Sequence, residues 1–264
     1  MTPNLMDNHK IDRWDGTTGT ERGFSLIEVA VVMFIIVLLL GSILIPLTTQ
    51  VEQRQISDTQ KQMEDIKEAL IGFAIANSYL PCPDSVGNDG VSDPNAAGPC
   101  TNAFGNIPWA TLNMPRGDAW GNRFRYRVAP EFTNMPATGD CLTNDGRLGL
   151  CDTGNITINE RIPATKATQI LSANTVAVIL SHGKNGFGAT STGGASQAAV
   201  PGANVDETTN ALMGTTYVNR TATGIGAPCS DTVAGQPFCE FDDIVVWISR
   251  FTLFNRMVSA GKLP

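Results

Sequence analysis

The feature that most constrains this chain is an uncharged, strongly apolar stretch close to its N-terminus. The seventeen residues from Val29 to Ile45 include no charged side chain. Together with Phe24 to Ile27, this stretch is long enough to cross a bilayer, which takes about 17–25 residues. The sequence therefore predicts a membrane-spanning segment at about 26–46, and the simplest interpretation is a single membrane anchor.

The helical pattern continues beyond this apolar stretch. After Pro46, apolar residues recur at helical spacing from Val51 to Phe73, and charged residues occupy the positions between them. Pro46 marks a bend or local break, and Pro81 and Pro83 cannot continue the helix. We expect one helix over 24–77, roughly 80 Å long at about 1.5 Å per residue.

The residues in front of the apolar stretch do not form a normal secretory signal. Residues 1–22 are polar and carry charges of both signs, and a secretory signal is cleaved after its apolar part. Here the plausible processing site precedes the apolar part, in the segment Arg22-Gly23-Phe24-Ser25-Leu26-Ile27-Glu28. Glu28 needs a partner, because a carboxylate in a membrane-spanning stretch is costly. The alternative is an unpartnered glutamate at the membrane edge.

These residues resemble the N-terminus of the type IV pilins and the type II secretion pseudopilins, whose leader peptidase cuts between a glycine and, usually, a phenylalanine. The resemblance implies that residues 1–23 are a leader, cut between Gly23 and Phe24, and that the prepilin peptidase N-methylates Phe24. It also implies that Glu28 pairs with the amine of Phe24 in a neighbouring subunit. That pairing would offset desolvation and set the register between subunits.

A head domain is expected over 78–264. Strict alternation from Phe124 to Val128 predicts a half-buried strand, preceded by a turn at 118–122 that is similar to one in the major pseudopilins. Arg123, Arg125 and Arg127 share the other face of this strand. We expect that face to be solvated, with an acidic partner as the alternative.

The remaining pattern completes an α+β prediction. Further strands are expected at 155–159, 175–181 and 243–247, and a short amphipathic helix at 249–260. An insertion at about 186–241 is rich in Gly, Ala, Ser, Thr and Asn at its start, and we expect a long exposed loop there. The predicted fold is a long N-terminal helix, its first half in the membrane, packed on a small antiparallel sheet with disulfide-pinned loops.

Six cysteines form an even set without a C-x-x-C pair, which favours disulfides over a zinc site. Six cysteines allow fifteen connectivities. The three pairs that are local in sequence are the simplest choice, and each would close a Gly/Asn/Asp-rich loop. These pairs are Cys82 with Cys100, Cys141 with Cys151, and Cys229 with Cys239.

One loop is similar to the calcium loop of the major pseudopilins. It runs from Leu180 through Asn185, and Asp242 and Asp243 follow much later in the chain. Oxygen ligands on a loop suit calcium, but Asn185 stands where the family usually has Asp. A plain turn before a charged strand start is favoured, so we predict no cofactor and keep calcium as the alternative.

Composition and motifs narrow the function to assembly or binding. A net charge of −7 argues against general nucleic-acid binding, and no catalytic constellation is visible, so we predict that the chain is not an enzyme.

The resemblance implies a filament subunit, a minor pilin or pseudopilin. Its partners would be other subunits, the prepilin peptidase and the inner-membrane assembly platform. The precursor would be single-pass in the bacterial inner membrane with its C-terminal domain in the periplasm, and the mature subunit would belong to a periplasmic or surface filament. The alternatives are a type II secretion pseudopilin and a membrane-anchored adhesive or ligand-binding module that does not polymerise.

Overall fold

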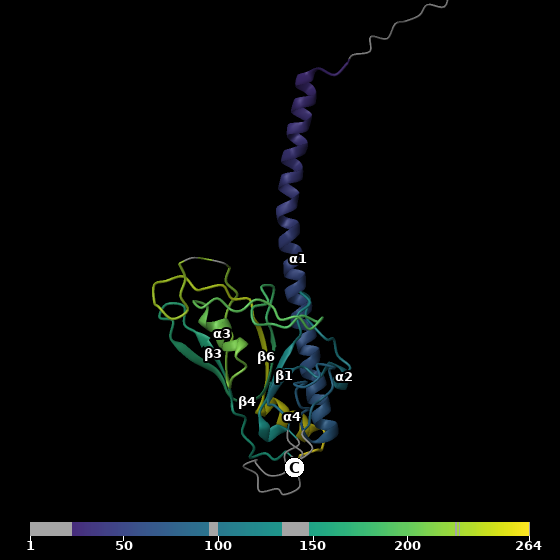
Figure 1. The fold of residues 1–264 in the computed structure, drawn as a ribbon, viewed down its shortest axis with the longest axis vertical. Helices are drawn as coiled ribbons and strands as arrows, with labels where there is room; N and C mark the ends of the chain where they lie inside the picture. Colours follow the sequence, from purple (N-terminus) through teal and green to yellow (C-terminus); the bar gives the residue numbers. More distant parts are fainter. Residues whose placement is uncertain (1–22, 95–99, 134–147, 225, 227, 264) are drawn as a thin grey trace, which may run out of the picture. The chain divides into compact units, whose positions relative to one another are not determined.

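The computed structural model describes the backbone of residues 23–94, 100–133, 148–224, 226 and 228–263, and the side chains of all of these except 41–47 (Figure 1). The chain divides into two compact units, Met1–Gln50 and Val51–Pro264. Helix α1, Leu26–Asn77, begins in the first unit and ends in the second. Of the leader expected at 1–23, only Gly23 lies within the described residues.

The helix agrees with the expected range 24–77 apart from its start at Leu26, and it continues through Pro46, where a bend or local break was expected. It ends at Asn77, where Ser78 takes a left-handed backbone conformation with φ 68° and donates its N–H to the Ala74 carbonyl. A left-handed residue just past the last turn is a common helix stop. Among the side chains that the structure describes, no helix is both long and apolar enough to cross a membrane. Side chains 41–47, inside the expected span 26–46, lie outside that description.

The second unit is built on a six-stranded sheet in the order β1-β2-β4-β3-β5, with β6 paired to β4. Every pairing is antiparallel except that of β3 with β5, which is parallel. The expectation of an antiparallel sheet is therefore corrected to a mixed one, because β5 comes from the inserted segment. The strands are β1 Phe104–Asn106, β2 Arg125–Val128, β3 Ile156–Arg161, β4 Thr168–Ser181, β5 Thr216–Val218 and β6 Ile244–Ser249.

Four short helical segments join this sheet. They are α2 Trp109–Leu112, the 3-10 helix η1 Pro130–Phe132, α3 Val205–Ala211 and α4 Arg250–Ser259. Ser249 caps helix α4: its Oγ accepts the Thr252 N–H at 3.2 Å and so satisfies one of the free donors of the first turn. The expected strands and C-terminal helix are all present, but β4 begins at Thr168 instead of near 175.

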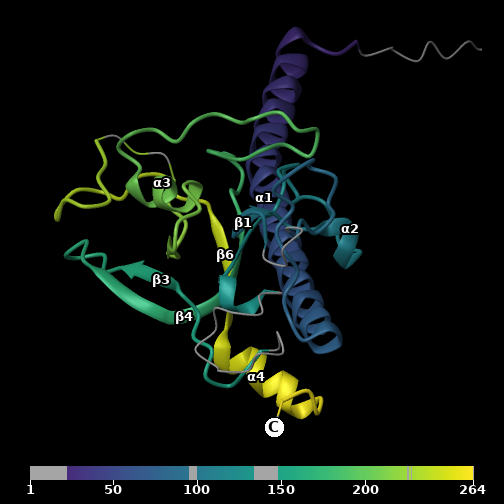
Figure 2. The same ribbon diagram turned by 60° about the horizontal axis from the view of Figure 1, so that its bottom comes forward.

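Strand β4 separates two buried clusters because its successive side chains point to opposite faces. Ala177 and Ile179 belong to the larger cluster, which includes residues of α1, β2 and α4. Val178 and Leu180 belong to the smaller one, with residues of β3, β5 and β6. Figure 2 shows α3 and β3 on the side of β6 away from α1. Because both faces of β4 are buried, its odd-numbered and even-numbered positions are both apolar. The strand therefore lacks a simple alternation of apolar and polar residues.

The insertion at 186–241 is more folded than expected. It contains α3 and β5, and Asp206, in α3, is fully buried, where it accepts from Arg161 at 2.7 Å and from Arg220 at 2.9 Å. Asp231 also accepts from Arg220, at 3.1 Å. Paired, hydrogen-bonded charges can be buried, so a segment with few apolar residues can pack against the sheet.

Disulfides close two of the expected loops. Cys82 is bonded to Cys100, and Cys229 to Cys239. Cys151 is also disulfide-bonded, and Cys141 lies outside the described residues.

The turn at 118–122 forms as predicted and docks on α1. Oδ1 of Asp118 accepts the N–H groups of Trp120 and Asn122 at 3.0 and 2.9 Å, while the N–H of Ala119 donates to Thr59 Oγ1 at 3.2 Å. Asp118 therefore shapes the turn, and the turn backbone contacts the helix.

Candidate functional site

The first turn of α1 holds the residues singled out at the N-terminus. Ser25 and Glu28 form a reciprocal pair: the Ser25 N–H donates to Glu28 Oε2 at 2.9 Å, and the Glu28 N–H donates to Ser25 Oγ at 3.2 Å. This is a capping box, which satisfies two backbone donors of the helix start. The Ser-x-x-Glu spacing is a sequence signal for such a cap.

All side chains from Phe24 to Leu40 are exposed within the first unit. Apart from Glu28, Ser25 and Ala30, they are large apolar groups. Contiguous apolar surface of this extent marks a site of contact with protein or membrane. The first unit thus presents a helix whose apolar groups need cover from another molecule or from lipid.

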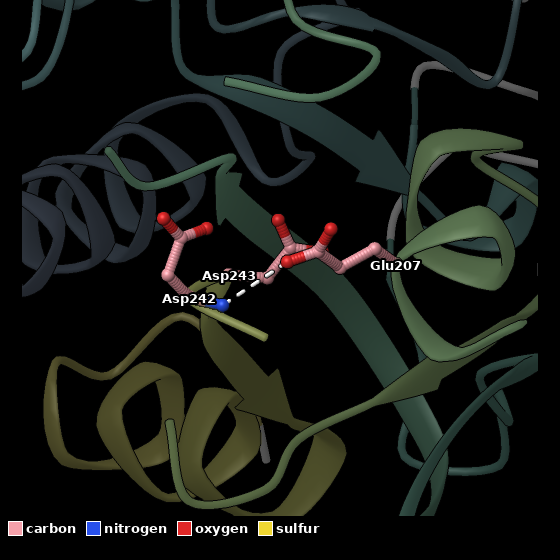
Figure 3. A group of neighbouring side chains, drawn as sticks. All are labelled: Glu207, Asp242 and Asp243. Carbon is pink, nitrogen blue, oxygen red and sulfur yellow. Dashed lines mark hydrogen bonds between the residues drawn. The ribbon is translucent and has the colours of Figure 1, made fainter. Parts of the chain in front are cut away.

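A second candidate site is a group of three carboxylates in the second unit. Glu207 comes from α3, and Asp242 and Asp243 come directly before β6 (Figure 3). One oxygen of each residue lies within 4.8 Å of the others. Glu207 and Asp243 are buried and Asp242 is half-buried.

Amide groups hold this arrangement in place. Glu207 Oε1 accepts from the Asp242 N–H at 3.1 Å and from Asn185 Nδ2 at 3.0 Å, and its Oε2 accepts from Asn204 Nδ2 at 2.8 Å. Asp242 Oδ2 accepts the Asn185 N–H at 2.8 Å. Oδ1 of Asp242 and Oδ1 of Asp243 are buried without a hydrogen bond in the described part of the chain. Asp242 Oδ1 is therefore left over, whereas Asp243 Oδ1 lies 3.4 Å from Nδ1 of His182.

The proton affinities of the cluster reflect its burial. Burial raises the pKa of Glu207 to about 8, with a further contribution from the nearby Asp243 charge. Burial also raises the pKa of Asp242 to about 6, again reinforced by Asp243. Like charges in a site of low polarity resist ionisation. The group can be neutralised by protons or by a cation, and hard oxygen ligands are the ones that Ca²⁺ and Mg²⁺ prefer.

The predicted calcium ligands are only partly brought together. Asp242 and Asp243 belong to the cluster, and Asn185 touches it as a hydrogen-bond donor. Leu180 lies within β4, paired with Arg125 and Val245, and its side chain lies in the smaller apolar cluster instead of among the three carboxylates. Glu207 was missed, since no local pattern links it to residues 35 positions further along.

A groove of about 780 Å³ opens beside these carboxylates. Its lining includes Gln60 of α1, Trp120 and Phe187, together with Asp242 and Asp243. The groove provides an approach for a solvated ion to the two acidic residues.

His182 is buried, and its Nδ1 lies 3.4 Å from Asp243 Oδ1. Ser181, the adjacent hydroxyl, donates to Asp118 at 2.6 Å instead of facing the imidazole. This geometry offers no activated nucleophile for the histidine.

Comparison with known proteins identifies the N-terminal segment. Residues 19–44 match the family model of the prokaryotic N-terminal methylation motif. No curated protein and no solved structure shows significant similarity to the chain. The matched range contains Gly23, Phe24, the capping box and the exposed apolar turns. The chain therefore carries the N-terminal methylation motif of the type IV pilins and pseudopilins.

Proposed function

We propose that this protein is a minor pilin or pseudopilin, a structural subunit built into a type IV pilus-like filament through the N-terminal part of α1. The observation that carries the proposal is the exposed apolar surface from Phe24 to Leu40, which lies within the methylation motif and has Glu28 as its single charge. A filament core of packed helices would cover that surface.

Processing would precede assembly. The prepilin peptidase removes residues 1–23 and methylates the new amine of Phe24. Until then the apolar part of α1 is held in the inner membrane with the C-terminal unit in the periplasm. On assembly, neighbouring helices replace lipid around the same apolar surface. Because both surroundings are apolar, moving the helix from membrane to filament costs little free energy.

Glu28 would set the contact between subunits. Its Oε2 accepts from Ser25, whereas no hydrogen bond to its Oε1 is found among the described residues. The free oxygen can accept from the methylated amine of Phe24 in a neighbouring subunit while the capping box stays closed. A charge pair with a satisfied second oxygen costs less to bury than a bare carboxylate.

The test begins with the intact mass and N-terminal sequence of the protein extracted from membranes of its native host. We expect a chain that starts at N-methylated Phe24, and Gly23→Asp should retain the leader. A wild-type chain still carrying residues 1–23 in a host with active peptidase would contradict the proposal.

Filament incorporation distinguishes a subunit from a membrane-anchored binding module that does not polymerise. Glu28→Leu should be processed normally but be depleted from sheared filaments at least about tenfold, since an unpaired core amine is costly. Glu64→Leu, which removes an exposed glutamate from the same helix, is the matched control and should be incorporated. Equal incorporation of both variants would favour the anchored module.

The alternative within the same class is a type II secretion pseudopilin. The turn at 118–122 supports it, whereas the disulfide-closed loops and the insertion support a surface pilin. Deleting the gene and measuring exported enzymes against surface filaments separates the two: loss of secretion alone indicates the pseudopilin.

We also propose that Glu207, Asp242 and Asp243 bind calcium. Support comes from the two buried oxygens without hydrogen bonds and from the convergence of three carboxylates from two segments, α3 and the residues directly before β6. For full-length protein in detergent, Ca²⁺ should raise the unfolding temperature above that in Mg²⁺ of equal ionic strength. Asp243→Asn should remove the difference and the exposed-site control Asp58→Asn should keep it. An identical unfolding temperature with and without Ca²⁺ would rule the site out.

A further inference from the structure

Strand β2 and the two residues before it bury one face in the larger apolar cluster and present three arginines on the other. Phe124, Tyr126 and Val128 belong to the cluster. Contrary to the expectation of a solvated face, Arg123 is 5% exposed and Arg125 and Arg127 are half-buried. The reason is the inserted segment, whose residues around Met213 and Tyr217 lie against this face.

The groups that contact Arg125 and Arg127 are neutral. Arg125 Nη1 donates to Asn106 Oδ1 at 3.3 Å, and Arg127 Nη1 donates to the Met213 carbonyl at 2.6 Å. Arg127 also lies over the Phe104 ring, 5.9 Å from its centroid. These contacts satisfy single N–H groups, but they do not supply a negative charge.

Neither guanidinium has a counterion in the described residues. No carboxylate oxygen there lies within 4.0 Å of a nitrogen of Arg125 or Arg127. The Nε groups of both residues are buried without a hydrogen bond. Burial lowers the pKa of Arg125, and the opposing influence comes from the Tyr217 hydroxyl instead of an acid.

Two arginines of the same unit, Arg161 and Arg220, whose side chains are 12% and 4% exposed, are treated differently. Arg161 and Arg220 both pair with Asp206, and Arg220 pairs with Asp231 as well. Burial raises the pKa of Asp84, and the nearby charge of Arg123 opposes that rise. Because buried charges are normally paired, the bare pair on β2 indicates a missing anion.

We propose that Arg125 and Arg127 bind an oxyanion of the phosphate or carboxylate class. Residues two apart on a strand face the same side about 6.7 Å apart, so one anion between them can accept from both guanidinium groups. The planar fork of arginine matches the paired oxygens of phosphate and carboxylate. This proposed site would bind an anion, whereas the carboxylate cluster would bind a cation. The proposal does not depend on whether the protein assembles into a filament.

The test uses full-length protein in detergent, with calcium removed by EDTA, and measures radiolabelled inorganic phosphate bound at equilibrium dialysis. Ionic strength is kept constant with sodium chloride, and unlabelled sulfate and acetate serve as competitors. We expect saturable binding of phosphate to the wild type. If only sulfate displaces the bound phosphate, the natural ligand is a tetrahedral anion. If acetate also displaces it, the natural ligand is a carboxylate, such as an acidic side chain of a partner.

Variants locate the binding. Arg125→Gln with Arg127→Gln should weaken phosphate binding at least about tenfold, whereas Arg54→Gln, an exposed arginine on α1, should leave it unchanged. If the double glutamine variant does not fold, Arg125→Lys with Arg127→Lys retains the charge and should still weaken binding, because lysine lacks the fork. Absence of saturable phosphate binding, or equal loss in Arg54→Gln, would overturn the proposal.

Discussion

The two parts of helix α1 use similar apolar residues in opposite ways. Leu38, in the first unit, is 56% exposed, whereas Leu70, in the second, is fully buried in the larger cluster. Burying a leucine contributes about 1.5–3 kcal/mol relative to leaving it exposed. The second part obtains that contribution inside its own chain. The first part obtains it only from another molecule, so the boundary near Gln50 separates folding from assembly.

The sharpest way to break this comparison is a matched pair of leucine truncations. Leu70→Ala should lower the free energy of unfolding of the second unit by about 2–5 kcal/mol, since it leaves a cavity in a closed core. Leu38→Ala should change it by less than about 0.5 kcal/mol, because the side chain has no contacts to lose there. Urea unfolding in detergent, followed by tryptophan fluorescence, measures both. Equal losses would mean that the two parts are one cooperative core.

The next largest effect is a pH dependence confined to the second unit. Glu207 keeps its proton up to about pH 8 when folded but releases it near its ordinary value of 4.5 when unfolded. The folded state therefore binds more protons in this range. Stability is highest below the unfolded pKa and is lost as the pH rises through the folded one.

At about 1.4 kcal/mol per pKa unit, calcium-free protein should lose roughly 2–4 kcal/mol between about pH 5 and pH 8. Glu207→Gln should flatten the profile, and the exposed control Glu64→Gln should retain it. Denaturant unfolding across this pH range in EDTA measures the slope. A slope that survives Glu207→Gln would assign it to other groups.

Helix caps provide a smaller and more local comparison. Ser249 caps α4 and Ser25 caps α1, each by accepting a backbone N–H three residues on at 3.2 Å. Ser249→Ala should cost about 1 kcal/mol of the stability of the second unit. Ser25→Ala should leave that stability within about 0.5 kcal/mol, because its helix start lies in the other unit. Thermal unfolding resolves the difference, and a reversed order would contradict the division into units.

The smallest effect is expected from the ion pair between Glu68 of α1 and Arg256 of α4. Both side chains are half-exposed, at 56% and 50%. Arg256→Gln should cost at most about 1 kcal/mol and less at high salt, since exposed pairs are screened. Arg54→Gln is the control. A loss that persists unchanged at high salt would show that Arg256 acts by packing instead of charge.

The patterns that predicted structure correctly were those with local periodicity. The apolar spacing in α1 and the alternation in β2 predicted the right elements. Along each of them, buried and exposed side chains recur with the period of the helix or of the strand. The start of β4 was missed, since Thr168 to Asn174 are mixed in polarity and pair with β3. Helix α3 was missed because its burial depends on the charged network around Asp206, and strand β5 because it is short and pairs with the distant β3.

The sequence alone determined the N-terminal motif and its single carboxylate, because these depend on residue order within a few turns of one helix. Only the tertiary structure brought Glu207 to Asp242 and Asp243 and deprived Arg125 and Arg127 of a counterion. Both arrangements join segments far apart in the chain, and their electrostatics depend on burial, which no local pattern encodes.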